Sequence, residues 1–384
     1  MTSGTRAIRV LFAIPALDRG GPDRVLFELI SALDRERFAP SLLVSQPNGH
    51  YLSRLPADVP IEILGDAGTF RDRYPLVRAL RFVRQTAPDV VLATQRMTFT
   101  LGLVAPAFPR TTRLVLRQAN DLSADFAMLV KRSPIKHRIA KQLALSTLRR
   151  ADVVVCQSTA MSNDLRTLLG PKATLRVISN PIDTDRTALE AAGLDVTLPG
   201  RPSLVAVGRL MHQKGFDVLL RALSVVRIDY PEIHLSILGD GPDRVALETL
   251  TKDLDLTRHV TFAGYSSHPL PYVRRADLFV LASRYEGFPN AALEALACGT
   301  PVVLTDCPGA NSEIVVPGMN GRLAAAVDEH AFASALRSAI AELPSYERGK
   351  IVENCKARFG RHRIVATYED LLTSATARRL TDKA

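Results

Sequence analysis

The chain of 384 residues contains no tryptophan, and its other aromatic residues are only 14 Phe and 8 Tyr. Aliphatic residues must therefore build its cores. They are plentiful, because 47% of the residues are hydrophobic and only 23% are charged. This composition is typical of globular proteins and excludes a disordered chain. The length exceeds that of one ordinary domain, so the sequence predicts two domains.

Cysteine is scarce, and its pattern excludes two kinds of site. The four cysteines, at positions 156, 298, 307 and 355, include no Cys-x-x-Cys pair, and their spacing suits neither a zinc site nor a disulfide framework. Cys156 and Cys298 lie inside apolar runs, which is typical of small core residues. Reduced thiols fit a cytoplasmic protein. The eight histidines form no metal-ligand spacing either; they are at positions 50, 137, 212, 234, 259, 268, 330 and 362.

Long hydrophobic runs are also missing. No window holds the roughly 18 uncharged apolar residues that a membrane span needs. The apolar run at 8–14 is too short for a secretory leader followed by a cleavage site. We expect a cytoplasmic protein, either soluble or peripheral on the inner face of the cell membrane.

The net charge of +10 is unevenly distributed along the chain. Residues 1–180 hold 26 Lys and Arg against 14 Asp and Glu, a net charge of +12, and the remainder holds 23 against 25, a net charge of −2. The basic first half indicates attraction to anionic lipid, nucleic acid or a phosphorylated acceptor.

Short apolar runs alternate with helix-period segments, which predicts α/β architecture with parallel sheets. The pattern breaks at 183–202, so we expect domains at 1–182 and 203–360 joined by that linker, with a last helix at about 361–384 that packs back onto the first domain. Two doubly wound sheets place ligands in a crevice at the carboxyl ends of their strands. The expected strands are 9–14, 41–44, 61–64, 89–93, 113–116, 152–155 and 176–178, then 203–207, 234–238, 260–262, 278–282 and 301–305.

Paired glycines, Gly20 and Gly21, lie between the first strand and a helix that starts near Asp23. Glycine allows the backbone to approach a phosphate closely, and the helix start favours its charge. A plain turn is the competing interpretation. The spacing Gly-x-Gly-x-x-Gly is absent after this strand, which argues against a nicotinamide or flavin enzyme.

The segment from Gly208 to Gly215 follows a strand and opens a helix, and it contains Arg209 and Lys214. Two cations at the carboxyl end of a strand are suited to holding a diphosphate and neutralising its charge as it leaves. Either cation alone is more often a solvated surface charge.

Glu286 lies in the loop after the strand expected at 278–282, and Glu294 lies inside the helix that follows that loop. A carboxylate accepts hydrogen bonds from adjacent hydroxyl groups of a sugar or ribose. We expect the free N–H groups of Asn290, Ala291 and Ala292, at the start of that helix, to suit phosphate or sugar oxygens.

In order and spacing, these segments resemble the family 4 retaining glycosyltransferases of the GT-B fold, most strongly from residue 203 to 321. The resemblance implies two Rossmann-like doubly wound domains facing across a cleft. Asn180-Pro181-Ile182-Asp183 also looks like the interdomain element of that family. The segments that carry the resemblance are Gly20-Gly21, Gly208-Arg209-Leu210, Lys214-Gly215, Leu238-Gly239-Asp240-Gly241-Pro242 and Glu286-x7-Glu294.

The resemblance implies a role for each matching position. Arg209 and Lys214 would bind the donor diphosphate, and Glu286 would contact the transferred sugar. Glu294 would bind the ribose hydroxyls, and Gly264 would lie where the nucleobase pocket begins. Gly21 would approach the β-phosphate from the other domain. The family transfers with retention and without a required metal, so we expect no cofactor and take Asp183-x-Asp185 as a chance match to a metal motif.

One departure concerns the acceptor side. Many members of the family carry a His near the end of the fourth or fifth strand of the first domain, whereas here those strands end in 93–96 and 116–121 without His. Arg117, Asn120 or Asp121 is the expected replacement. This departure bears on the acceptor type and on any catalytic base, and less on donor binding.

The segment 129–150 contains seven Lys and Arg and no acid, with apolar residues at helical intervals. Such a helix suits an anionic membrane surface, where each cation contributes roughly 1 kcal/mol. A solvated basic face is the alternative. We expect no nucleic-acid binding, because aromatic residues are not interleaved with the basic ones.

The predicted function is transfer of a hexose or N-acetylhexosamine from a nucleoside-diphosphate sugar to a glycolipid, polysaccharide or polyprenyl-linked acceptor. The Phe288-Pro289-Asn290 variant resembles a subgroup that often uses UDP-sugars. Two alternatives remain open at this stage: a sugar-nucleotide 2-epimerase of the same fold, and a non-catalytic relative that serves as a scaffold.

Overall fold

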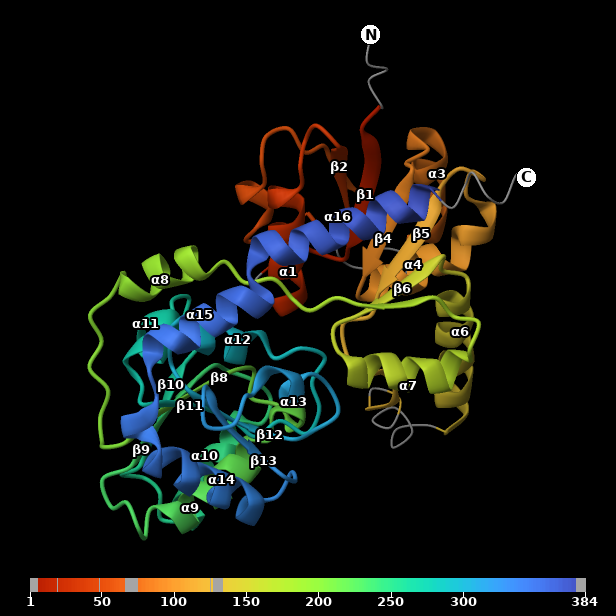
Figure 1. Cartoon of the computed structure of the whole chain (residues 1–384). Coiled ribbons are helices and arrows are strands. Elements are labelled where there is room, and N and C mark those ends of the chain that lie inside the picture. Colours follow the sequence, from red (N-terminus) through yellow and green to blue (C-terminus); the bar gives the residue numbers. More distant parts are fainter. Residues whose placement is uncertain are drawn as a thin grey trace. The chain divides into compact units, whose positions relative to one another are not determined.

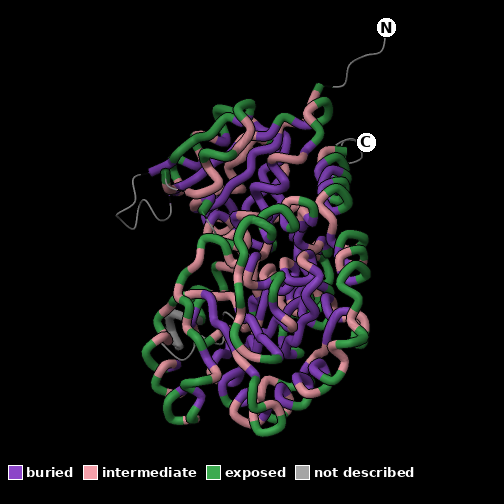
Figure 2. Tube along the Cα trace, turned by 90° about the vertical axis from the view of Figure 1, so that its left-hand side faces the viewer, coloured by how far each residue is buried: buried purple, intermediate pink, exposed green. Residues whose placement is uncertain are grey.

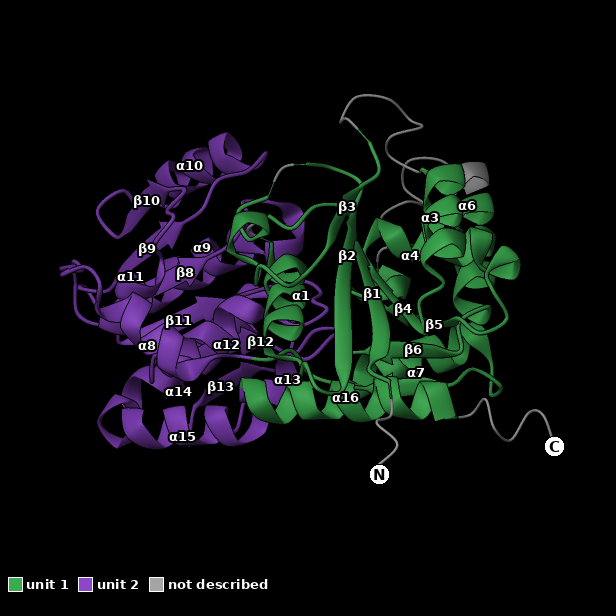
Figure 3. Ribbon diagram, turned by 90° about the horizontal axis from the view of Figure 1, so that it is seen from above, with its two compact units in different colours: residues 1–181, 361–384 green, residues 182–360 purple. Residues whose placement is uncertain are grey.

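The computed structural model describes residues 6–18, 20–47, 49–65, 75–124, 126 and 134–377, with only the backbone for 134–137. The chain forms two compact units (Figure 3). Unit 1 comprises Met1–Pro181 and Arg361–Ala384, and unit 2 comprises Ile182–Gly360. The chain therefore passes between the units twice.

The described part of unit 1 contains a seven-stranded parallel sheet with the order β3-β2-β1-β4-β5-β6-β7 (Figure 1). The order reverses between β1 and β4, which is where doubly wound sheets bind ligands. The strands are β1 (Ile8–Ile14), β2 (Phe38–Val44), β3 (Ile61–Ile63), β4 (Val90–Thr94), β5 (Arg113–Arg117), β6 (Val153–Cys156) and β7 (Leu175–Val177).

Helices cover both faces of this sheet, so its strands are apolar on both sides. Along β1, Val10 and Phe12 pack toward α1 and α16, while Leu11 and Ala13 pack toward α3, α4, α6 and α7. The helices are α1 (Gly21–Ala32), α3 (Leu76–Thr86), α4 (Arg96–Val104), α6 (Pro134–Arg149), α7 (Thr159–Leu169) and α16 (Arg361–Ala377).

Unit 2 contains a six-stranded parallel sheet with the order β10-β9-β8-β11-β12-β13. Its switch point lies between β8 and β11, and buried residues pack on both faces of the sheet. Figure 2 colours the buried residues of the chain purple. The strands are β8 (Ser203–Val207), β9 (His234–Leu238), β10 (Val260–Gly264), β11 (Leu278–Leu281), β12 (Val302–Thr305) and β13 (Gly321–Ala324). The helices are α8 (Thr184–Ala192), α9 (Phe216–Val226), α10 (Arg244–Asp253), α11 (Leu270–Arg275), α12 (Asn290–Ala297), α13 (Asn311–Ile314), α14 (Glu329–Ala341) and α15 (Arg348–Phe359).

The predicted fold class, two Rossmann-like doubly wound units, is confirmed by these two sheets. The sequence analysis missed the edge strand β13, because four residues that begin with a glycine carry little periodicity. It also treated 183–202 as a linker, whereas this segment contains α8 and lies within unit 2. Asp183 caps α8 by accepting a hydrogen bond from the backbone N–H of Arg186 at 3.0 Å.

The last helix, α16, is part of unit 1 and lies beside α1 (Figure 1). Val365, Tyr368 and Leu372 are buried in the same core as β1. Glu369 accepts a hydrogen bond from the backbone N–H of Asp34 at 2.9 Å. Among the described residues, no helix is long and apolar enough to cross a membrane.

Candidate active site

The carboxyl ends of β8 and β11, neighbours in the sheet of unit 2, carry two loops that are joined to each other. The N–H of Arg284 donates to the carbonyl of Gln213 at 2.8 Å, and Gln213 Nε2 donates to the carbonyl of Tyr285 at 3.1 Å. Gly215 has a φ of 61°, and a Cβ there would lie 1.9 Å from the Ala282 oxygen. Only glycine fits this crossing point, so the loop after β8 is packed directly against β11.

Lys214 and Glu286, predicted from the sequence to act together, are in direct contact. Lys214 Nζ lies 2.6 Å from Glu286 Oε1, and the Ser283 hydroxyl donates to the same oxygen at 2.6 Å. Glu286 is 4% exposed. Burial in a site of low dielectric strengthens the attraction, and the two donors hold the carboxylate in one position.

The backbone around Glu286 is fixed as firmly as its side chain. The N–H of Glu286 donates to the carbonyl of Pro308 at 2.9 Å, and a Cβ at Gly309 would lie 2.1 Å from the backbone carbonyl oxygen of Glu286. Nearby, burial and the charge of Glu286 together raise the pKa of the Cys307 thiol to about 12. Cys307 is therefore a neutral thiol at physiological pH and packs as a core residue.

A second ion pair joins the loop after β11 to the start of α9 and to the loop that precedes it. Arg284 donates from Nη1 and Nη2 to the two carboxylate oxygens of Asp217, at 2.8 and 2.6 Å, and Nη1 also donates to the carbonyl of His212 at 2.8 Å. Burial acts to raise the pKa of Asp217, but the hydrogen bonds and charge of Arg284 outweigh it and lower that pKa. The sequence analysis missed this pair, since nothing in the spacing of residues 217 and 284 signals it.

The other predicted donor residues of unit 2 lie on adjacent loops. Arg209, directly after β8, is exposed and forms no hydrogen bond or ion pair with the described residues. A Cβ at Gly239 would lie 1.9 Å from the Gly208 oxygen, so the loops after β8 and β9 cross through glycines. Gly264 ends β10 with a φ of 73°, and Glu294 is half-buried in α12.

The expectation of free N–H groups at the start of α12 is wrong for two of its three residues. The N–H of Asn290 donates to the carbonyl of Phe288 at 2.9 Å, and that of Ala292 donates to Pro289 at 3.0 Å. The chain turns tightly through Phe288-Pro289 before the helix, which brings these carbonyls within reach of the N–H groups. Ala291 lies between them and is half-buried.

In unit 1 the predicted residues lie at the carboxyl ends of β1 and β5. Gly20 precedes α1 as its N-cap, and Gly21 is its first residue. Arg117 is only 1% exposed, and its guanidinium donates to Asn180 Oδ1 and, at 3.4 Å, to Thr94 Oγ1. Among the described residues no carboxylate forms an ion pair with it.

Asn120 and Asp121 follow Arg117 in the loop after β5. Asn120 is half-buried, and its carbonyl accepts from Gln118 Nε2 at 3.2 Å. Asp121 is 6% exposed and accepts from the N–H of Ala124 at 2.8 Å, and burial raises its pKa. The acceptor-side assignment of Arg117, Asn120 and Asp121 stays a prediction, and the burial of two of them weighs against direct contact with a ligand.

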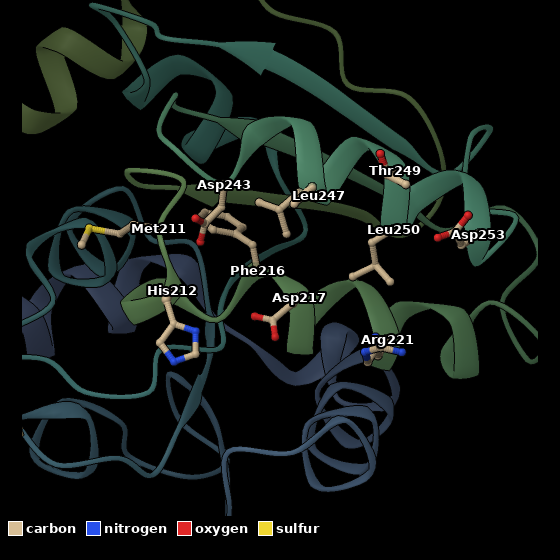
Figure 4. Close-up of a pocket in the computed structure, with 11 residues that line it drawn as sticks. Met211, His212, Phe216, Asp217, Arg221, Asp243, Leu247, Thr249, Leu250 and Asp253 are labelled. Atoms are coloured by element: carbon tan, nitrogen blue, oxygen red, sulfur yellow. The ribbon is translucent and has the colours of Figure 1, made fainter. Parts of the chain in front are cut away.

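A groove of about 510 Å³ lies between α9 and α10, beside the loop that carries Lys214 (Figure 4). Its floor includes the buried side chains of Phe216 and Leu247. His212 lies at one end of the groove, and Arg221 and Asp253 lie at the other. His212 is exposed and therefore stands outside the Lys214–Glu286 contact.

No group of three or more His, Cys, Asp or Glu within the described ranges is placed to hold a metal ion. Asp183 is the cap of α8, and Asp185 forms an exposed ion pair with Lys356 at 3.1 Å. The Asp-x-Asp motif noted in the sequence thus has a structural account for each of its carboxylates.

Comparison with known proteins matches both units. Residues 19–186 match the sequence profile described as Glycosyltransferase Family 4, and residues 201–342 match that described as Glycosyl transferases group 1. The Rhizobium meliloti lipopolysaccharide core biosynthesis glycosyltransferase LpsE is 35% identical over 235 residues, which are 60% of this chain and 66% of that protein. The chain thus spans just under two thirds of the length of LpsE.

Two further comparisons extend over almost the whole chain. The lipopolysaccharide core biosynthesis glycosyltransferase LpsD of the same organism is 28% identical over 370 residues, 94% of this chain and 97% of that one. The crystal structure of Anabaena HepE in complex with UDP-glucose covers 96% of this chain and 100% of its own, with a TM-score of 0.76 and 20% identity.

Two doubly wound units of this kind form the GT-B fold, which the likeness to HepE shows as well. Within this fold, residues 19–186 form a Glycosyltransferase Family 4 domain, and residues 201–342 form a Glycosyl transferases group 1 domain.

Proposed function

We propose that the protein transfers a hexose or N-acetylhexosamine from a nucleoside-diphosphate sugar, most simply a UDP-sugar, to a glycolipid, polysaccharide or polyprenyl-linked acceptor of the cell surface. The observation that carries this proposal is the contact between Lys214 and Glu286 at the switch point of unit 2. This contact puts a cation and a buried carboxylate side by side. A leaving diphosphate needs the cation, and the hydroxyl groups of the attached sugar need the carboxylate as a hydrogen-bond acceptor.

In this mechanism Lys214 and the exposed Arg209 bind the diphosphate and neutralise the charge that grows on it as the glycosidic bond breaks. Glu286 accepts hydrogen bonds from sugar hydroxyls, and Glu294 accepts those of the ribose. The ion pair and Ser283 hold Glu286 before the donor arrives, so little reorganisation is needed during the reaction.

We propose further that transfer proceeds with retention and without a metal. The support is that two cations of the chain itself are available for the diphosphate, the role that Mg²⁺ plays in other phosphate-transfer sites. Anomeric analysis of the product tests retention directly, and an inverted product would contradict it. Activity that disappears with a chelator and returns with Mg²⁺ would contradict metal independence.

The names of the relatives support a role in surface glycans. LpsE and LpsD are both described as lipopolysaccharide core biosynthesis glycosyltransferases, and HepE is described in complex with UDP-glucose. For the present chain, the acceptor class and the uridine nucleotide are therefore proposals that an experiment has to test.

The first experiment is a thermal-shift screen of UDP, GDP, ADP and their sugar conjugates, each with and without Mg²⁺. A ligand at about a hundred times its dissociation constant adds roughly 2.7 kcal/mol of stability, which moves the melting temperature by several degrees. We expect a shift with uridine nucleotides that does not depend on Mg²⁺. A donor that is epimerised without an acceptor would indicate an isomerase, and binding without turnover would indicate a scaffold.

We also propose that α6 contacts an anionic membrane surface on the cytoplasmic side. Ile139 and Leu143, one turn apart on α6, are 57% and 40% exposed, and Arg138 beside them is exposed as well. Exposed apolar side chains next to cations suit the boundary between headgroups and acyl chains. Lys131 and Arg132 of the predicted segment lie outside the described residues, and residues 134–137 are described by backbone alone.

Vesicle sedimentation tests this surface. Replacing both Ile139 and Leu143 with Ser should weaken binding to anionic vesicles about tenfold, because two partly inserted side chains are lost. The matched control is Leu189→Ser, since Leu189 is 75% exposed on α8 of unit 2. Unchanged binding by the double variant would leave α6 as an ordinary solvated helix.

A further inference from the structure

Gln95 follows β4 directly and has an unusual backbone conformation, with φ 53° and ψ −136°. Residues with a side chain rarely adopt these backbone angles, which glycine adopts without strain. In the described part of the chain, two other non-glycine residues have positive φ, Ala87 and Asp255. Ala87 ends α3 at φ 41° and ψ 58°, an ordinary left-handed cap. Gln95 lies outside that region, so its strain needs a separate explanation.

The strained conformation brings the amide of Gln95 to a buried carboxylate. Gln95 Nε2 donates to Asp23 Oδ1 at 2.7 Å, although the two residues are 72 positions apart in the sequence. Asp23 lies in the first turn of α1, directly after the Gly20-Gly21 loop. Because β1 and β4 are neighbours in the sheet, this hydrogen bond joins the ends of two adjacent strands at the switch point of unit 1.

Asp23 in turn shapes the glycine loop. It is 7% exposed, and its Oδ2 accepts from the N–H of Gly20 at 3.1 Å and from the N–H of Asp18 at 3.2 Å. A Cβ at Gly20 would lie 2.9 Å from that oxygen, so a side chain at this position would require the carboxylate to shift. The conformation of the loop therefore depends on the hydrogen bonds that its N–H groups donate to Asp23.

The carboxylate of Asp23 depends on Gln95. Burial raises the pKa of Asp23, and no cation among the described residues contacts it. Gln95 is the one side-chain donor that Asp23 has in the described part of the chain. Losing that donor would leave a buried oxygen unpaired, which is costly and favours rearrangement of the loop.

We propose that Gln95 is a positioning residue for the glycine loop. Gln95 fixes Asp23, and Asp23 fixes Gly20, so that the loop keeps one shape for its ligand. The ligand class, the diphosphate of a nucleoside-diphosphate sugar, rests on the proposed function. The strained backbone of Gln95 is retained because an unstrained residue would direct its side chain elsewhere.

Two variants separate this role from a purely structural one. Gln95→Ala and Gln95→Gly both remove the amide, but only the glycine variant also relieves the backbone strain. We expect Gln95→Gly to melt at a higher temperature than Gln95→Ala. Both should raise the donor KM about tenfold, the value of one lost hydrogen bond, and should change kcat less than threefold. If the two variants share the same raised donor KM but differ in melting temperature, the loss of binding comes from the missing amide and not from lower stability.

Ala87→Gly is the matched control, because it relieves a positive φ at the opposite, amino end of β4. It should retain the donor KM and kcat of the wild type. A wild-type donor KM in Gln95→Gly would overturn the proposal, and so would equal melting temperatures of the two Gln95 variants. Failure of the proposed function would appear in the wild type, as absent transfer, whereas failure of this inference would appear only in the variants.

Discussion

The switch points of the two units are built from the same topology but held together by different chemistry. In unit 2, ion pairs join the loops: Lys214 with Glu286, and Arg284 with Asp217. At the switch point of unit 1, two buried charges have neutral side-chain partners: Asp23 is bound by Gln95 and Arg117 by Asn180. At the switch point of unit 2 each of these charges faces an opposite charge, whereas at that of unit 1 each charge depends on hydrogen bonds from neutral groups.

The largest expected effect is loss of the buried ion pair of unit 2. Lys214→Ala or Glu286→Ala should lower transfer at least a hundredfold, about 2.7 kcal/mol in the barrier, because each removes a partner of the reacting group. Circular dichroism should show that both variants stay folded.

The control for this prediction is the exposed pair of Lys350 and Glu347, whose atoms lie 2.6 Å apart. Lys350→Ala removes the same residue type from a pair at the same distance, and transfer should not change. Near-normal transfer by the Lys214 or Glu286 variant would refute the assignment of the site.

A smaller effect is expected from the second ion pair, which touches no reacting atom. Arg284→Ala frees the carbonyl of His212 and leaves Asp217 without its partner, so the loop that carries Lys214 loses a clamp. Transfer should fall about tenfold. Arg284→Lys should recover only part of it, since Lys lacks the bidentate fork. Equal transfer by the Ala and Lys variants would show that the charge pairing is irrelevant.

The smallest expected effect is an opposite pH dependence of stability at the two switch points. The pKa of Asp23 is raised, so the folded state binds a proton more readily than the unfolded one. Stability contributed by this group therefore increases as the pH falls from above its raised pKa toward 3.8. The pKa of Asp217 is lowered, and its contribution is present above 3.8 and lost as the pH falls through its folded pKa.

Urea unfolding of the wild type and the single Asn variants from pH 7 to pH 3 measures this contrast. Relative to Asp23→Asn the wild type should become more stable at lower pH, and relative to Asp217→Asn it should become less stable. If both stability differences changed with pH in the same direction, the contrast between the two switch points would be refuted.

The sequence predicted most of the fold because buried parallel strands read as short apolar runs bounded by turns. It also selected Lys214 and Glu286 as residues of one donor site, and the structure adds that they are in direct contact on the loops after two neighbouring strands. It missed α8 and β13, which carry few apolar residues at regular intervals.

The sequence did not predict side-chain contacts between positions that are far apart in the chain. The hydrogen bond of Gln95 to Asp23 depends on a backbone angle, and glutamine gives no signal of positive φ. The N–H groups of Asn290 and Ala292 were misjudged for a similar reason, because the turn through Phe288-Pro289 decides their partners. Motifs thus located the loops, and local geometry decided their internal bonds.

The place of α16 has a consequence for synthesis on the ribosome. Tyr368 and Leu372 complete a core that begins with Val10 and Phe12, and Glu369 receives a hydrogen bond from Asp34, 335 positions earlier. Unit 2, which is continuous in sequence, can fold as soon as it emerges. Unit 1 emerges first, but the sheet face that α1 shares with α16 stays partly uncovered until α16 leaves the exit tunnel. The nascent form of unit 1 is therefore exposed to aggregation and to chaperones.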